Sequence, residues 1–140
     1  MSLKLEFILS QTDGRPMYLQ IMELIKSQVT SGDWLQGYKL PSIREMAVAT
    51  KVSVITVKRA YRELESEGVI VTQHGKGSFI SEIDNLSAKI KEQDMDKSLN
   101  MAIAMARSIG MSKEQLTNRL ADLLKADNQQ DTNKSENNND

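Results

Sequence analysis

Two helix-start signals, Ser42 and Ser53, stand so close together that only one short helix and a tight turn fit between them. Ser42 opens the sequence Ser-Ile-Arg-Glu, in which the serine hydroxyl and the Glu45 carboxylate can each accept a backbone N–H of the other residue. This predicts a short helix at about 43–49 and a second helix that runs from Ser53 to a capping Gly68. Because such short helices are unstable alone, both must pack against other elements.

The flanking segments complete this pattern. Apolar residues at helical spacing predict a first helix between Pro16 and Gly32. After the third helix, two short β-branched runs at 69–72 and 78–81 are joined by a glycine-containing turn, which predicts a β-hairpin. The order is helix, helix, tight turn, helix and hairpin. The predicted fold is therefore mainly α with a small β-hairpin, a winged helix-turn-helix followed by a short helical dimerisation element.

The second half predicts two more helices, one ending at Gly110 and one opening at Ser112. Their apolar stripes are too small to form a core alone, so we expect them to pair with a second copy of the chain. The expected interface residues are Met95, Leu99, Ala102, Ile103, Ala106, Leu116 and Leu120. An alternative is that methionines here line a pocket for a small apolar effector.

These patterns divide the chain into three parts. Residues 1–81 are expected to form the winged helix-turn-helix domain, and residues 82–126 the helical dimerisation domain. Residues 127–140 contain no large apolar side chain, so we expect a disordered tail.

Charge is distributed unevenly along the 140 residues, although the total is only −1. Residues 1–81 carry ten Lys/Arg and eight Asp/Glu, whereas residues 82–140 carry eight Lys/Arg and eleven Asp/Glu. The segment from Lys39 to Arg62 is the most basic. A basic first half indicates an anionic partner. Together with the predicted helix-turn-helix, it makes double-stranded DNA the expected partner.

Several classes of protein are excluded by composition. The chain has no cysteine and one histidine, which leaves no Cys nucleophile, Cys-ligated metal or multi-histidine site. No nucleophile–base pair or phosphate loop is visible, so we expect neither an enzyme nor a cofactor. No apolar run approaches the ~20 residues of a membrane span. With no secretory signal recognised, the expected location is the cytoplasm.

A helix-turn-helix places the N-terminal residues of its second helix in the major groove. The candidate contacts on this helix are Ser53, Val54, Ile55, Thr56 and Lys58. Arg44, at the start of the preceding helix, can bind a phosphate or a base edge. The predicted wing tip, His74, Gly75 and Lys76, is placed to reach the minor groove.

Each of these residues also has an ordinary structural interpretation. Arg44 and Lys58 could be solvated charges, and His74 a plain turn residue rather than a DNA contact. Arg59 and Arg62 could bind the DNA backbone, or Arg59 could pair with Glu63 one turn away.

Val54 and Ile55 could belong to the core. However, the core face of this helix is already filled by Val57, Ala60, Tyr61 and Leu64.

Several spaced motifs, in this order, resemble the GntR family of bacterial transcription factors. They are Pro16–Ile21, Leu40–Ala47, Thr56–Glu65, Gly68–Ile70 and Gly75–Ile80. The two-helix second half, with the segment at 108–116, is similar to the YtrA-like subfamily. That subfamily consists of dimeric repressors, often of transporter operons, which lack a large effector domain.

The resemblance implies DNA contacts at the positions of Arg44, Val54, Ile55, Thr56, Lys58, His74 and Gly75. Many members carry polar or basic residues where this chain has Val54 and Ile55, so the expectation here is either contact with thymine methyl groups or recognition of DNA shape. The predicted function is a homodimeric, operator-binding repressor of its own or a transporter operon. The alternative is a regulator that responds to a small apolar effector.

Overall fold

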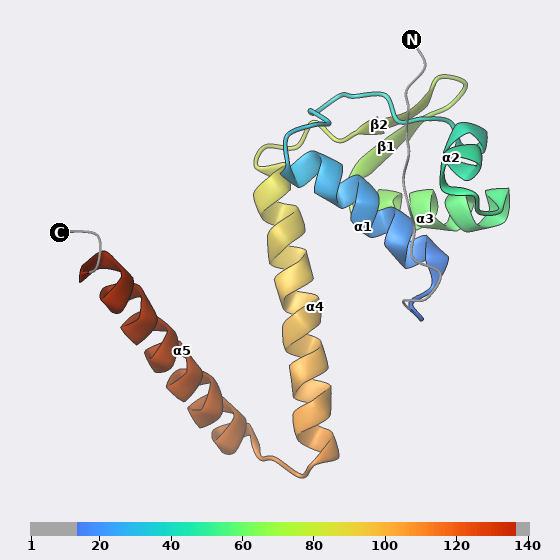
Figure 1. Cartoon of the computed structure of the whole chain (residues 1–140). Helices are drawn as coiled ribbons and strands as arrows, with labels where there is room; N and C mark the ends of the chain where they lie inside the picture. The colour runs from blue at the N-terminus through green and yellow to red at the C-terminus, as the bar shows by residue number, and fades with distance from the viewer. Residues whose placement is uncertain (1–13, 137–140) are drawn as a thin grey trace. The chain divides into compact units, whose positions relative to one another are not determined.

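The computed structural model describes residues 14–136 of the chain, which forms two compact units, Met1–Glu92 and Gln93–Asp140. Residues 1–13 of the predicted first domain and 137–140 of the predicted tail lie outside the described residues. The elements in chain order are α1 (Met17–Thr30), α2 (Ile43–Thr50), α3 (Val54–Ser66), β1 (Ile70–Gln73), β2 (Gly77–Ile80), α4 (Leu86–Ser108) and α5 (Lys113–Glu136) (Figure 1). This order confirms the predicted fold class, a winged helix-turn-helix followed by two helices.

The predicted helix boundaries follow from capping groups that are present in the structure. Pro16 precedes α1, and Gly32 follows it with a φ of 84° that suits glycine. At α2, the Glu45 N–H donates to Ser42 Oγ at 3.1 Å, and the Ser42 N–H donates to Glu45 Oε1 at 3.3 Å. At α3, Ser53 Oγ accepts from the Thr56 N–H at 3.2 Å. Each cap satisfies an N–H that has no partner within its helix.

The wing is an antiparallel hairpin of β1 and β2, in which Ile70 pairs with Ile80. A third segment that we did not predict runs along its edge. Leu40 N donates to Ser78 O at 2.8 Å, Ile80 N donates to Tyr38 O at 2.9 Å, and Lys39 bridges to Phe79. Gly37 and Pro41 mark this stretch as a loop in the sequence. Its pairing is between residues far apart in the chain, which local patterns do not reveal.

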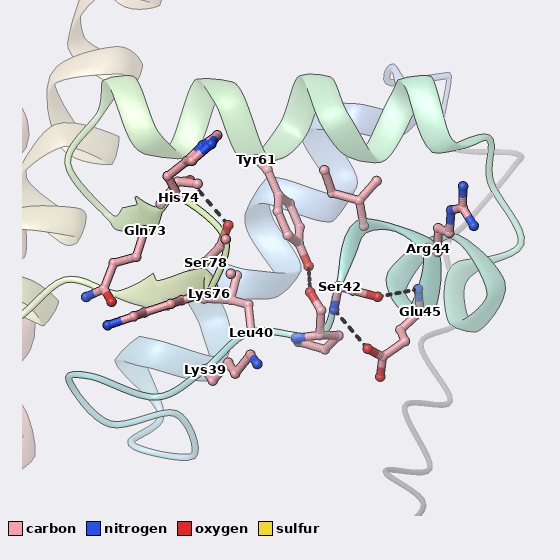
Figure 2. Close-up of a pocket in the computed structure, with 15 residues that line it drawn as sticks. Lys39, Leu40, Ser42, Arg44, Glu45, Tyr61, Gln73, His74, Lys76 and Ser78 are labelled. Carbon is pink, nitrogen blue, oxygen red and sulfur yellow. Dashed lines mark hydrogen bonds between the residues drawn. The ribbon is translucent and has the colours of Figure 1, made fainter.

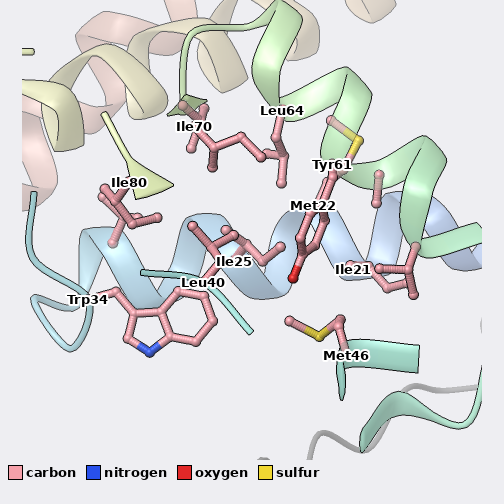
Figure 3. Packing of buried hydrophobic residues seen from close by; sticks show 14 of the residues in the cluster. Ile21, Met22, Ile25, Trp34, Leu40, Met46, Tyr61, Leu64, Ile70 and Ile80 are labelled. Carbon is pink, nitrogen blue, oxygen red and sulfur yellow. The ribbon is translucent and has the colours of Figure 1, made fainter. Parts of the chain in front are cut away.

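The core of the first unit lies between α1, α2, α3 and the inner ends of the hairpin (Figure 3). Ile25 from α1, Met46 from α2, Leu64 from α3 and Ile80 from β2 are fully or almost fully buried in it. Leu86 and Ile90, at the start of α4, belong to the same cluster. The first compact unit therefore extends to Glu92, beyond the boundary predicted after residue 81.

A buried ion pair joins α1 to the end of α3. Lys26 Nζ lies 2.8 Å from Glu67 Oε2, and the two side chains are 7% and 21% exposed. Glu67 is the C-cap residue of α3 and immediately precedes the turn into the wing. The pair therefore anchors the start of the wing to α1.

The second unit contains most of α4 and all of α5. The predicted cap at Ser112 is confirmed, since Gln115 N donates to Ser112 Oγ at 3.1 Å and Ser112 N donates to Gln115 Oε1 at 2.9 Å. The predicted disorder is wrong for residues 127–136, where α5 continues to Glu136. No glycine or proline follows Gly110, so nothing in the sequence interrupts the helix. Within residues 14–136, no helix has the length and apolar character needed to cross a membrane.

Candidate nucleic-acid interface

Arg44 stands in the first turn of α2 and is exposed. The capping box at Ser42 and Glu45 fixes the start of this helix, while Met46 and Ala47 bury its inner face. Since the backbone is held on both sides, the Arg44 side chain leaves the helix from a defined place on the surface. It is therefore free of the core, as the sequence predicted.

The turn between α2 and α3 is made by a lysine in a left-handed conformation. Lys51 has a φ of 57° and a ψ of 39°, and the Val52 N–H donates to Ala47 O at 3.2 Å. A non-glycine residue in this conformation costs roughly 1–2 kcal/mol. This closes α2 and starts α3 within three residues, which directs the N-terminus of α3 to the surface.

The first turn of α3 presents apolar side chains to solvent. Val54 is 46% exposed and Ile55 is 81% exposed, and Lys58 on the next turn is exposed as well. The opposite face of α3 is buried, as predicted, through Val57, Ala60, Tyr61 and Leu64. The alternative that Val54 and Ile55 belong to the core is therefore wrong. Two exposed β-branched residues next to a lysine form a surface that can contact thymine methyl groups.

Ser53 and Thr56 are coupled through their hydroxyl groups. Ser53 Oγ and Thr56 Oγ1 lie 2.8 Å apart, and either can be the donor. One hydroxyl hydrogen is used in this bond, so the other hydroxyl keeps its hydrogen for an outside acceptor. The pair can therefore donate one hydrogen bond to a phosphate oxygen.

The tip of the wing consists of His74, Gly75 and Lys76, all exposed. Lys76 N donates to Gln73 O at 3.0 Å, which closes the turn, and Gly75 has a φ of 75°. Glycine adopts this conformation without steric cost. The tip therefore has a small residue flanked by a histidine and a lysine, as the sequence predicted.

A cleft of about 530 Å³ lies between the start of α2 and the wing, and it brings four predicted residues together (Figure 2). Arg44 lines one end, and His74, Gly75 and Lys76 line the other. Lys39, which was not among the predicted contacts, lines the same cleft. The only feature of the sequence that pointed to Lys39 was its position in the basic segment from Lys39 to Arg62.

Four of the five remaining predicted residues border two other depressions, and Val54 lines neither of these. Ser53 and Thr56 lie with Lys51 beside one of them, and Ile55 and Lys58 lie beside the other. The candidate interface is thus a series of neighbouring surfaces along α2, α3 and the wing, not a single pocket. An extended partner suits such a surface better than a small molecule does.

Arg59 stacks on the ring of Tyr18, a contact that was not predicted from the sequence. Its guanidinium carbon lies 3.8 Å from the centre of the Tyr18 ring in α1. This is a cation–π contact, in which the positive charge is attracted to the face of the ring. Arg59 thus contributes to holding α3 against α1.

Tyr61 fixes the loop that leads into α2. Its hydroxyl donates to Pro41 O at 2.7 Å inside the protein (Figure 2). Burial raises the pKa of Tyr61 well above its ordinary value, and the nearby Glu45 carboxylate raises that pKa further. The phenol therefore stays protonated and keeps donating at all ordinary pH values.

We expect Tyr61→Phe to lower the free energy of unfolding by about 1 kcal/mol, since it leaves Pro41 O without its buried donor. Urea denaturation at pH 7 measures this.

Folding favours the protonated phenol of Tyr61, so wild-type stability should fall as pH rises above about 10, the pKa of an unfolded tyrosine. The phenylalanine ring of the variant has no proton to lose, so the gap between the two proteins should shrink above that pH. A constant gap from pH 7 to 11 would contradict the argument.

Comparison with known proteins agrees with this geometry. The family of bacterial regulatory proteins described as gntR matches residues 17–80. The HTH-type transcriptional repressor YtrA of Bacillus subtilis (strain 168) is 37% identical over 107 residues, which cover 72% of this chain and 78% of the repressor.

Two solved structures show the same arrangement. A GntR family transcriptional regulator from Listeria monocytogenes is similar at a TM-score of 0.58 and 28% identity, over 79% of this chain and 96% of that one. AraR(DBD), in complex with operator ORX1, is similar at a TM-score of 0.51 and 29% identity, over 54% of this chain and 95% of that one.

A winged helix-turn-helix with an exposed reading helix and a cationic cleft defines the class of DNA-binding transcriptional regulators. The chain belongs to the GntR family of bacterial regulatory proteins. The resemblance to YtrA-like members that was noted from the sequence is confirmed.

Proposed function

We propose that this protein is a homodimeric repressor that binds a palindromic operator in the cytoplasm. The observation that carries the proposal is the exposure of Arg44 at the start of α2, of Ile55 and Lys58 on α3, and of the wing tip, with Arg44 and the wing tip lining one cleft. It places groups that bind phosphate beside groups that contact base edges, which is the combination that sequence-specific binding requires. The similarity to a repressor and to an operator-bound domain supports the same conclusion.

The second unit supports the homodimer. Met95, Leu99 and Ile103 of α4 are 54%, 41% and 37% exposed, and Leu120 of α5 is 46% exposed. Monomeric proteins rarely leave so many large apolar side chains in contact with water along one element. Burial against a second copy removes this surface from water, and a two-fold dimer matches a palindromic site.

The predicted interface residues differ in their exposure in the single chain. Ala106 is buried within the single chain, and Leu116 is half-buried. Met95, Leu99, Ala102, Ile103 and Leu120 are exposed and remain the candidates for contact with the second copy. The small apolar effector stays a prediction; Met101 and Met105, which would adapt to it, are 72% and 70% exposed.

Selection of binding sites from random duplex DNA tests the function directly. We expect the selected sites to be inverted repeats whose half-site centres lie about one helical turn, ~34–36 Å, apart. Sedimentation of the complex should give two chains per duplex. Recovery of unrelated sequences by a folded protein would contradict sequence-specific binding, and a single half-site with one bound chain would contradict the dimer.

A further inference from the structure

We propose that Lys39 is a further DNA contact, which binds a backbone phosphate in the cleft between the wing and α2. The inference rests on the proposed function, since it assigns a role within the DNA interface. It adds a residue from the loop before α2, a part of the chain to which no DNA contact was assigned from the sequence.

The backbone at Lys39 is held from two sides. Along the wing, Leu40 N donates to Ser78 O at 2.8 Å, Ile80 N donates to Tyr38 O at 2.9 Å, and Lys39 itself bridges to Phe79. On the helical side, Tyr61 Oη donates to Pro41 O at 2.7 Å. The residue is therefore carried by a rigid segment that ties the wing to α2 and α3.

The side chain of Lys39 crosses the wing at Gly77. A Cβ atom added to Gly77 would lie 3.1 Å from Lys39 Cε and 3.9 Å from Lys39 Nζ. The missing side chain at Gly77 thus leaves the space that the lysine stem occupies. The ammonium group of Lys39 therefore lies beside the wing, next to Gly77.

The charges around the cleft favour an anion. The residues that line it include three basic side chains, Lys39, Arg44 and Lys76, and one acidic side chain, Glu45. The Glu45 carboxylate already accepts the Ser42 N–H in the capping box. Figure 2 shows Lys39 and Lys76 at the wing end of the cleft and Arg44 at the α2 end.

A DNA strand contacted by both the wing and α2 must pass over this cleft. Lysine is a compact charge on a flexible stem, which suits attraction to a phosphate rather than reading of a base. Phosphate contacts fix the position of a protein on the duplex and carry no sequence information directly. Lys39 should therefore strengthen binding to every sequence equally.

The test uses two variants of the full-length protein and one control. Lys39→Met keeps a long apolar stem over Gly77 but removes the charge, whereas Lys39→Arg keeps the charge. Lys89→Met, on the exposed surface of α4 and outside the cleft, is the matched control. Dissociation constants are measured for a selected operator and for a scrambled duplex at several salt concentrations.

One phosphate contact contributes about 0.9 to the slope of log affinity against log salt. The homodimer carries two copies of Lys39, so K39M should lower the slope by about 1.8, and a fourfold rise in salt should weaken the wild type about 12-fold more than K39M. We expect K39M to lose affinity for both duplexes by the same factor, and K39R and K89M to keep the wild-type slope.

An unchanged slope in K39M would overturn the proposal, and so would a loss confined to the selected operator, which would indicate a base contact. Both results presuppose that the wild type prefers its selected operator. If the wild type itself shows no preference, it is the proposed function that fails.

Discussion

Replacing Leu99 and Ile103 with glutamate is expected to produce a monomer whose operator affinity is lower by roughly 10²–10⁴-fold. These side chains lie one helical turn apart on α4 and are 41% and 37% exposed in the single chain. Two carboxylates would oppose the two of the second copy and would lose solvation on association. Because each monomer then engages one half-site alone, the gain from linking two binding modules disappears.

The matched control places the same two charges elsewhere on the same helix. Asn100→Glu with Ala104→Glu changes exposed positions that helical spacing turns away from the Leu99 and Ile103 stripe. Analytical ultracentrifugation should give a dimer for the wild type and the control and a monomer for L99E/I103E. Circular dichroism should show the winged domain folded in all three proteins. Wild-type affinity in a folded L99E/I103E variant would contradict dimerisation through α4.

Replacing Arg44 with alanine is expected to have the second large effect, a loss of about 1–3 kcal/mol of operator binding per half-site. Arg44 is exposed at the start of α2 and lines the cleft that faces the wing. Its guanidinium can form two parallel hydrogen bonds to a guanine edge or to a phosphate, which lysine cannot reproduce. Arg44→Lys should therefore recover only part of the loss.

The pattern of the loss tells which group Arg44 binds. If it binds a base, R44A should relax the preference at one base pair in each half-site of the selected operator, and if it binds a phosphate, all sequences should weaken equally. Binding of a panel of single-base operator variants by fluorescence anisotropy separates the two. Lys89→Ala is the control on α4. Affinity within a factor of two of wild type on every duplex would contradict an Arg44 contact.

The parts of the site that could be predicted from the sequence depend on contacts within a few residues. Ser42 with Glu45, Ser53 with Thr56 and the turn at Gly75 involve partners no more than three residues apart. The exposure of Ile55 followed from the same reasoning, because helical spacing assigned its neighbours to the core. Such features follow from local backbone geometry and do not depend on how the other elements pack.

The parts that were missed depend on residues distant in the chain. The pairing of Lys39 with Phe79, and the contact of Arg59 with Tyr18, each join elements that meet only when the core has formed. The same holds for Ile90, which is 2% exposed in the core of the first unit although it belongs to a helix assigned to the second domain.

The sequence by itself therefore determined the helices and the hairpin, their order, and the residues that α2 and α3 expose at their starts, because local capping and periodicity decide those. The tertiary structure alone decided that the loop before α2 pairs with the wing and that Lys39 thereby joins Arg44 and Lys76 along one cleft. The physical reason is that burial of Leu40, Tyr61 and Ile80 in one core brings these backbones together. A sequence pattern does not show which residues far apart in the chain come together in space.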